Sequence, residues 1–204
     1  MRKRGCGRRQ YAARGERNVM SDKKRLLFVV GSLRRGSFNR ILATHAAEHL
    51  ADQAEVEILE YTDVPLMNQD IEFPAPAPVS RVRASFSAAD AVWFFSPEYN
   101  RTMTAPMKNV IDWMSRPLVA GDYKTPLPLT GKPAAISGVG GANATAGSRA
   151  ALRALLEFVK ARPVQGDGEG FSLPSATWAT SVYEIPDEDA ARLDAQADGL
   201  LAAL

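Results

Sequence analysis

Residues 91–114 read AVWFFSPEYNRTMTAPMKNVIDWM, and this stretch decides the fold. Its first five residues are apolar, and they stop at Ser96-Pro97, which cannot continue a strand. After a polar turn the apolar residues return at helical spacing, at Met107, Val110, Ile111 and Met114. The stretch therefore predicts a buried strand, a loop and a helix. Loops at the carboxyl ends of strands bind ligands in open α/β sheets, and this loop suits a flat ligand with polar edges.

The composition is that of an ordinary globular domain. The chain has 204 residues, of which 46% are hydrophobic and 24% are charged, enough for one domain with a proper core. No run of 18 apolar residues is present, which argues against a membrane-spanning helix. The single cysteine, Cys6, rules out a disulfide framework and agrees with a cytoplasmic location.

The charge is distributed unevenly along the chain. Residues 1–20 carry seven Lys and Arg against one acid, Glu16, so the formal net charge of +2 leaves −4 for residues 21–204. A basic arm can neutralise phosphates, but a disordered extension ahead of an alternative start at Met20 is the favoured interpretation. We therefore expect a basic disordered tail over 1–22, one domain over 23–204, and no nucleic-acid or membrane partner.

Strand patterns and helix patterns alternate along the rest of the chain. Short apolar runs predict parallel strands at 26–30, 56–61, 91–95, 132–137 and near 163–165. Helical spacing predicts helices at 39–51, 79–88, 107–115, 148–160 and from 186 to the C-terminus. The alternation predicts an α/β fold with a doubly wound five-stranded parallel sheet in the order 2-1-3-4-5 and helices on both faces.

Three connecting segments are rich in proline or glycine. Four prolines in residues 62–78 predict an irregular loop, and residues 116–131 form a second irregular crossing. Residues 166–170, Gly-Asp-Gly-Glu-Gly, predict a flexible turn.

In the predicted strand order the loops after strands one, three and four converge. The first loop holds Ser32, Arg34, Ser37 and Asn39 ahead of a helix, and its hydroxyls, guanidinium and amides predict a phosphate site without a metal. The loop lacks the Gly-Lys-Ser/Thr ending of a Walker motif and the spacing of the dinucleotide fingerprint. The alternative is a surface loop in which Asn39 caps the helix.

The second and third loops suit the flat part of the same ligand. Backbone groups around Glu98 and Asn100 can bind a ring edge while Tyr99 lies near the ring face, although Pro97 and Asn100 are also common in β-turns. The third loop, 137–141, allows close backbone approach because its glycines lack side chains. A monophosphate and a flat heteroaromatic ring describe a mononucleotide, and flavin mononucleotide (FMN) fits best.

Four motifs, in this order, carry a resemblance to a known family. They are Gly31-Ser32-Leu33-Arg34-x-Gly36-Ser37-x-Asn39-Arg40, Pro97-Glu98-Tyr99-Asn100-x-Thr102, Lys108-Asn109-x-Ile111-Asp112-Trp113-x-Ser115-Arg116-Pro117 and Gly131-Lys132-Pro133. They resemble the NADPH-dependent FMN reductases, and most nearly the bacterial quinone and chromate reductases of flavodoxin-like fold. The resemblance covers about Leu26 to Arg153 and is absent beyond Arg162.

The resemblance implies a two-electron oxidoreductase with FMN as cofactor and NADPH or NADH as hydride donor. It implies small-molecule acceptors such as quinones, free flavin, azo compounds or chromate, and assembly as a homodimer or homotetramer. Carried onto this chain, the phosphate ligands are Ser32, Arg34, Ser37 and Asn39, and the ring contacts are Pro97, Glu98, Tyr99, Asn100, Ser137 and Gly140.

Two segments depart from the family pattern. In Thr102-Met103-Thr104-Ala105-Pro106 the proline stands two positions later than usual, which affects the entry to the following helix. Residues 147–153 replace the usual start of a helix that contributes to tetramer contacts in the family.

Hydride transfer between stacked rings needs no side-chain acid, base or nucleophile, so we expect no catalytic residue. His45 and His49 have the spacing of a metal pair, but without a third ligand a solvated helix edge is favoured over a metal site. Trp113 is expected in the core or a dimer interface, and Asp112 at the helix end or supporting the loop. The alternative functions are a flavodoxin-like electron carrier, a dehydrogenase, and a non-catalytic FMN- or nucleotide-binding module.

Overall fold

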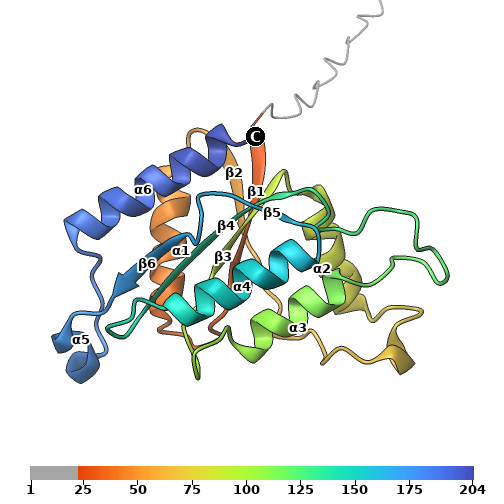
Figure 1. Cartoon of the computed structure of the whole chain (residues 1–204), viewed down its shortest axis with the longest axis horizontal. Helices are drawn as coiled ribbons and strands as arrows, with labels where there is room; N and C mark the ends of the chain where they lie inside the picture. The colour runs from red at the N-terminus through yellow and green to blue at the C-terminus, as the bar shows by residue number, and fades with distance from the viewer. Residues whose placement is uncertain (1–22) are drawn as a thin grey trace, which may run out of the picture.

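The computed structural model describes residues 23–204, so the predicted basic tail lies outside the described residues. A parallel sheet forms the centre, and its order β2-β1-β3-β4-β5 is the predicted one (Figure 1). Its first four strands are β1 (Lys24–Val30), β2 (Ala54–Ile58), β3 (Ala91–Phe95) and β4 (Pro133–Gly140). Strands β1, β3 and β4 are direct neighbours, with Phe94 beside both Val29 and Ile136. Their three exit loops therefore open at one edge of the sheet.

Two short strands occupy the fifth position of the sheet. β5 (Arg162–Pro163) pairs with the start of β4, and β6 (Glu169–Ser172) pairs with its end. The predicted fifth strand is present as β5 and a turn follows it at residues 166–167, but the end of the predicted turn region belongs to β6, a sixth strand that was not predicted. Gly168 permits the chain to return to the sheet: its φ is +71°, and a Cβ there would lie 1.9 Å from the carbonyl oxygen of Ile136.

Helices cover both faces of the sheet (Figure 1). One face carries α1 (Phe38–His49) and α6 (Asp187–Ala202), and the other carries α2 (Ala77–Ala88), α3 (Ala105–Met114) and α4 (Ala146–Phe158). Alternate strand residues enter the two cores: Phe28 and Trp93 face α1, whereas Val29 and Phe94 face α3. Burial on both faces explains why these strands are apolar throughout.

The proline-rich segment 62–78 is less irregular than predicted. A short 3₁₀ helix, η1 (Gln69–Ile71), lies within it, and α2 begins at Ala77 rather than Val79. Pro78 stands in the first turn of α2, where the missing backbone N–H removes no helical hydrogen bond. Among residues 23–204 no helix is both long enough and apolar enough to cross a membrane.

The two histidines of α1 are partly exposed, as expected for a helix edge, but they also contact α6, which was not predicted. His45 Nε2 lies 2.9 Å from an oxygen of Asp194, and His49 Nε2 lies 2.8 Å from an oxygen of Asp198. The partners are 149 residues away, beyond the reach of a local pattern. In the described part of the chain no group of three His, Cys, Asp or Glu residues is placed to hold a metal ion.

The structure decides between the alternatives for two residues of α3. Trp113 is buried in the core on the α3 face, and its Nε1 donates to the carbonyl oxygen of Pro65 at 2.9 Å. Asp112 pairs with Lys108 one turn earlier on the same helix, at 2.6 Å. Both residues therefore serve the helix and its packing.

Candidate cofactor site

Eight of the ten predicted site residues line one pocket of about 280 Å³ at the carboxyl edge of the sheet. They are Ser32, Arg34, Ser37, Asn39, Pro97, Glu98, Tyr99 and Gly140. Asn100 and Ser137 do not line it. The pocket thus joins the loops that follow β1 and β3 to the end of β4.

The first loop presents hydrogen-bond donors at the start of α1. Ser37 is the N-cap: its Oγ accepts from the N–H of Arg40 at 3.3 Å, so its own hydroxyl hydrogen can be donated elsewhere. Within residues 23–204 the N–H groups of Phe38 and Asn39 have no acceptor, as expected for a first helical turn. These donors stand at the positive end of the helix dipole, which suits an anion.

Arg34 adds a guanidinium to this donor set. It lies over the ring of Phe38, 4.6 Å from the ring centroid, and forms no ion pair with any carboxylate of residues 23–204. Stacking restricts the side chain while leaving its N–H groups free to donate. Hydroxyls, amides and an unpaired guanidinium together fit a phosphate group.

Asn39 joins the first loop to the end of β4. It is buried, and its side-chain amide donates to the carbonyl oxygen of Val139 and accepts from the N–H of Val139, both at 3.1 Å. The predicted alternative that Asn39 caps α1 was wrong, because Ser37 fills that position. Asn39 instead fixes the distance between two walls of the pocket.

The second loop ends in a tight hairpin. Tyr99 and Thr102 exchange two backbone hydrogen bonds of 3.0 and 3.1 Å, and Asn100 and Arg101 between them have φ values of 54° and 63°. Two left-handed residues in succession are typical of a type I′ turn, a conformation that asparagine tolerates well. The β-turn considered as an alternative is therefore present. It places Asn100 at the tip, outside the pocket, and leaves Tyr99 55% exposed beside it.

Thr104 connects the first and second loops. Its hydroxyl donates to the carbonyl oxygen of Gly31 at 2.6 Å and accepts from the N–H of Met107 at 3.4 Å, which makes it the N-cap of α3. Pro106 lies in the first turn of α3, where proline is tolerated. The displaced proline of this chain is thus compatible with a regular helix entry.

Glu98 points its carboxylate at the start of α4. It accepts from Asn143 Nδ2 at 2.6 Å and from the N–H of Ser148 at 3.0 Å. Partial burial acts to raise the pKa of Glu98, but the hydrogen bonds from Ser148 and Asn143 outweigh it, and the pKa lies below its ordinary value. The side chain therefore anchors the second loop, and only its backbone remains available to a ligand.

Replacing Glu98 with glutamine is expected to lower the free energy of unfolding of the FMN-free protein by about 1 kcal/mol near neutral pH, because a charged helix cap is lost. The folded pKa of Glu98 is depressed, so its contribution is present above the unfolded pKa and disappears as the pH falls through the folded pKa. Urea unfolding of both proteins at decreasing pH measures this. A difference that stays constant down to strongly acidic pH would contradict the assignment.

The predicted third loop is mostly strand. β4 continues through Gly140 because β6 pairs with residues 137–140, which leaves only Gly141 of the predicted loop outside it. The Ser137 hydroxyl is fully buried: it accepts from Trp93 Nε1 at 2.9 Å and donates to Gln196 of α6. Ser137 therefore faces the core beneath α6, whereas Gly140 reaches the pocket.

Six further residues line the pocket that were not named from the sequence, although Val139 and Gly141 lie within the predicted third loop. They are Phe38, Val139, Gly141, Leu173, Thr177 and Ser181. The position of Phe38 between Ser37 and Asn39 could have indicated it. The last three follow β6, where no motif marks them.

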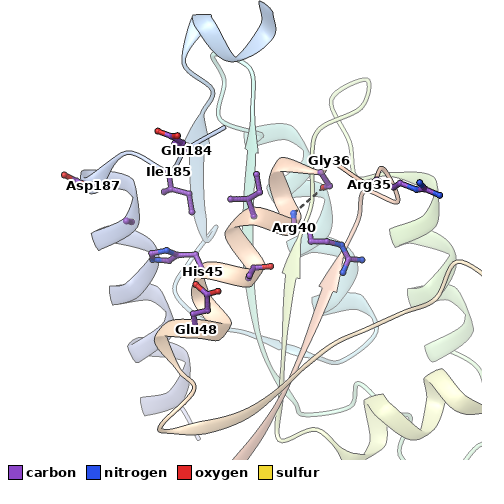
Figure 2. Close-up of a pocket in the computed structure, with 12 residues that line it drawn as sticks. Arg35, Gly36, Arg40, His45, Glu48, Glu184, Ile185 and Asp187 are labelled. Atoms are coloured by element: carbon purple, nitrogen blue, oxygen red, sulfur yellow. Dashed lines mark hydrogen bonds between the residues drawn. The ribbon is translucent and has the colours of Figure 1, made fainter. Parts of the chain in front are cut away.

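A larger groove of about 660 Å³ lies on the outer side of α1 and shares only Ser37 with the cofactor pocket. Figure 2 shows Arg35 and Arg40 on one side of it and Glu184 and Asp187 on the other. Carboxylates on one wall disfavour a phosphate ligand, and the loop after β3 does not reach this groove. The smaller pocket is therefore the candidate cofactor site.

Known proteins resemble this chain in sequence and structure. Residues 24–170 match the NADPH-dependent FMN reductase family. An NAD(P)H-dependent FMN reductase of Pseudomonas aeruginosa is 37% identical over 147 residues, 71% of this chain and 76% of that protein. A quinone reductase of Pseudomonas putida is 38% identical over 142 residues, 69% of this chain and 73% of that protein. The flavoenzyme FerB of Paracoccus denitrificans, an NAD(P)H:(acceptor) oxidoreductase, has a TM-score of 0.76 and 28% identity, covering 88% of this chain and 96% of its own.

An archaeal flavodoxin shares the architecture alone, with a TM-score of 0.56 and 13% identity. Reductases and flavodoxins share this fold, but the sequence matches are to reductases. They therefore support an enzyme rather than the electron carrier considered as an alternative. The chain belongs to the NADPH-dependent FMN reductase family and is a flavodoxin-like oxidoreductase that uses FMN and NAD(P)H.

Proposed function

We propose that this protein transfers two electrons from NAD(P)H, by way of FMN in the cofactor pocket, to a quinone. The observation that carries the proposal is the convergence of the phosphate-type loop after β1 and the hairpin after β3 on one pocket. Quinone is proposed because relatives from Pseudomonas putida and Escherichia coli are named quinone reductases. Free flavin is a second acceptor, since the Pseudomonas aeruginosa relative is named an FMN reductase. The names of these relatives do not support chromate or azo compounds as acceptors.

The residues of the pocket fit the two ends of FMN. Ser32, Arg34 and Ser37, with the first amides of α1, would hold the phosphate, and Pro97, Tyr99 and Gly140 would lie beside the ring. Glu98 and Asn39 would position these groups through α4 and β4. Bound FMN supplies the hydride chemistry, so the side chains need only bind, orient and shield it.

The pocket would leave part of the cofactor accessible. Its volume of about 280 Å³ is just below the smallest cavities that enclose a drug-sized ligand, which are roughly 300 Å³. A ring with one open face can meet the nicotinamide and then the quinone at the same position. We therefore propose that donor and acceptor bind in turn.

We also propose that the protein acts in the cytoplasm as a homodimer or homotetramer. Tyr123 and Phe158 are 81% and 82% exposed and line one groove of about 470 Å³. Large apolar side chains gathered in this way are typical of a surface covered by another protein, here a second copy. Light scattering on the purified protein measures the assembly.

The FMN-loaded protein is expected to lose its flavin absorbance near ~450 nm when NADPH is added without oxygen, and to regain it when a quinone follows. Absorbance spectra at each addition measure both half-reactions separately, and NADH in place of NADPH determines the preferred donor. A spectrum unchanged by excess NADPH and NADH would favour an electron carrier. A spectrum bleached by NADPH but not restored by any quinone would move the proposal to free flavin.

A further inference from the structure

We infer that residues 173–183 complete the cofactor pocket, and that the Thr177 hydroxyl binds the ribityl phosphate arm of FMN. The inference rests on the proposed function, because it assigns a further contact in the same pocket. The segment includes α5 (Ser175–Thr180) and begins after the family match, which ends at residue 170. The family match therefore does not assign it a role.

The segment is joined to the pocket at both ends. At one end the N–H of Leu173 donates to the carbonyl oxygen of Gly140 at 2.8 Å, beside the ring side of the pocket. At the other end the ring of Tyr183 contacts the ring of Phe38, with centroids 5.6 Å apart. Phe38 in turn supports Arg34 on the phosphate side. The segment thus spans the pocket from its ring side to its phosphate side.

Thr177 lies between these two attachment points in the sequence and lines the pocket. Only 4% of the residue is exposed, yet its hydroxyl forms no hydrogen bond with any residue of the described chain. Unlike the Tyr183 hydroxyl it is not fully buried, so it stays open to the pocket and can form a hydrogen bond with a polar ligand atom there. The middle of FMN is its polyol chain, which carries hydroxyls and ends in the phosphate. Position and chemistry therefore point to this arm rather than to the ring.

The test compares the affinities of the wild type and of Thr177→Val for three flavins by quenching of flavin fluorescence. Valine keeps the shape of threonine and removes the hydroxyl. The variant is expected to bind FMN about 3- to 10-fold more weakly, the effect of one hydrogen bond. Riboflavin lacks the phosphate and lumiflavin lacks the whole arm. If the variant loses affinity for both FMN and riboflavin, the hydroxyl contacts the ribityl chain. If it loses affinity for FMN alone, the hydroxyl contacts the phosphate. Lumiflavin affinity is expected to stay unchanged.

Two variants serve as controls. Thr177→Ser retains a hydroxyl and is expected to restore FMN affinity. Thr44→Val makes the same substitution on α1, at a residue that lines the outer groove and not the cofactor pocket, so wild-type affinity is expected.

Three results would overturn the inference. The first is that Thr177→Val binds FMN as tightly as the wild type; this result would not affect the proposed function. Another is a loss of equal size for lumiflavin, which indicates a general disturbance of the wall. A wild-type protein that binds no FMN would remove the proposed function together with this inference.

Discussion

Replacing Arg34 with alanine is expected to weaken FMN binding about 10- to 100-fold, because hydrogen bonds to a charged group contribute about 1.5–3 kcal/mol. Arg34 is held over Phe38 and has no carboxylate partner in the described chain, so its charge is available to the phosphate. Titration of the FMN-free protein with FMN, followed by fluorescence quenching, measures the effect. Riboflavin affinity is expected to change little because riboflavin has no phosphate.

Arg35 provides the matched control. It is the adjacent residue with the same side chain, but it lines the groove outside α1 and not the cofactor pocket. Arg35→Ala is expected to keep FMN affinity within about twofold of the wild type, the effect of a distant surface charge. If both variants lost affinity equally, the effect would come from the net charge of the loop. If Arg34→Ala bound FMN normally, the phosphate would lie elsewhere.

Replacing Gly138 with alanine is expected to lower the free energy of unfolding by about 3 kcal/mol. The melting temperature is expected to fall by about 6 to 12 °C, the scale for a domain of this size. A Cβ on Gly138 would lie 2.3 Å from the carbonyl oxygen of Ser96 and 2.4 Å from Oγ1 of Thr145. The Ser96 contact is backbone, so β3 or β4 must shift. Thermal unfolding of the FMN-free protein measures the loss.

Gly141 is the control for this substitution. A Cβ there meets nothing within 4 Å, and its φ is not in the left-handed region, so Gly141→Ala is expected to unfold like the wild type. The shift caused by Gly138→Ala would also move the loop after β3, so we expect weaker FMN binding as well. Wild-type stability of Gly138→Ala would show that β3 and β4 have room for a methyl group between them.

The centre of the fold could be predicted because its strands are buried on both faces. Ala91–Phe95 is apolar at every position, and the structure places a strand over that same range. β6 could not be predicted in this way, since Glu169–Ser172 contains one large apolar residue, Phe171. It becomes a strand through its hydrogen bonds to β4, which are formed only in the folded protein. Local pattern therefore identified the strands of the main path and missed β6.

The same distinction applies to the site. Residues in the loops after β1 and β3 were predicted because each loop carries its chemistry within a few adjacent residues. The partners of Asn39 and Ser137 lie 100 and 59 residues away, at Val139 and Gln196. Their side chains are occupied by these partners, which no local motif reveals. Thr177 enters the pocket from a third distant segment.

The interruption between β5 and β6 has a consequence for solubility in a crowded cell. A long free strand at the border of a sheet can recruit strands from other molecules and start aggregation. At this border β5 contributes two residues, one of them Pro163, and β6 contributes four. Between them the chain leaves the sheet and returns through Gly168. Neither piece offers a continuous row of backbone groups, so this side of the protein is a poor template for intermolecular β-structure.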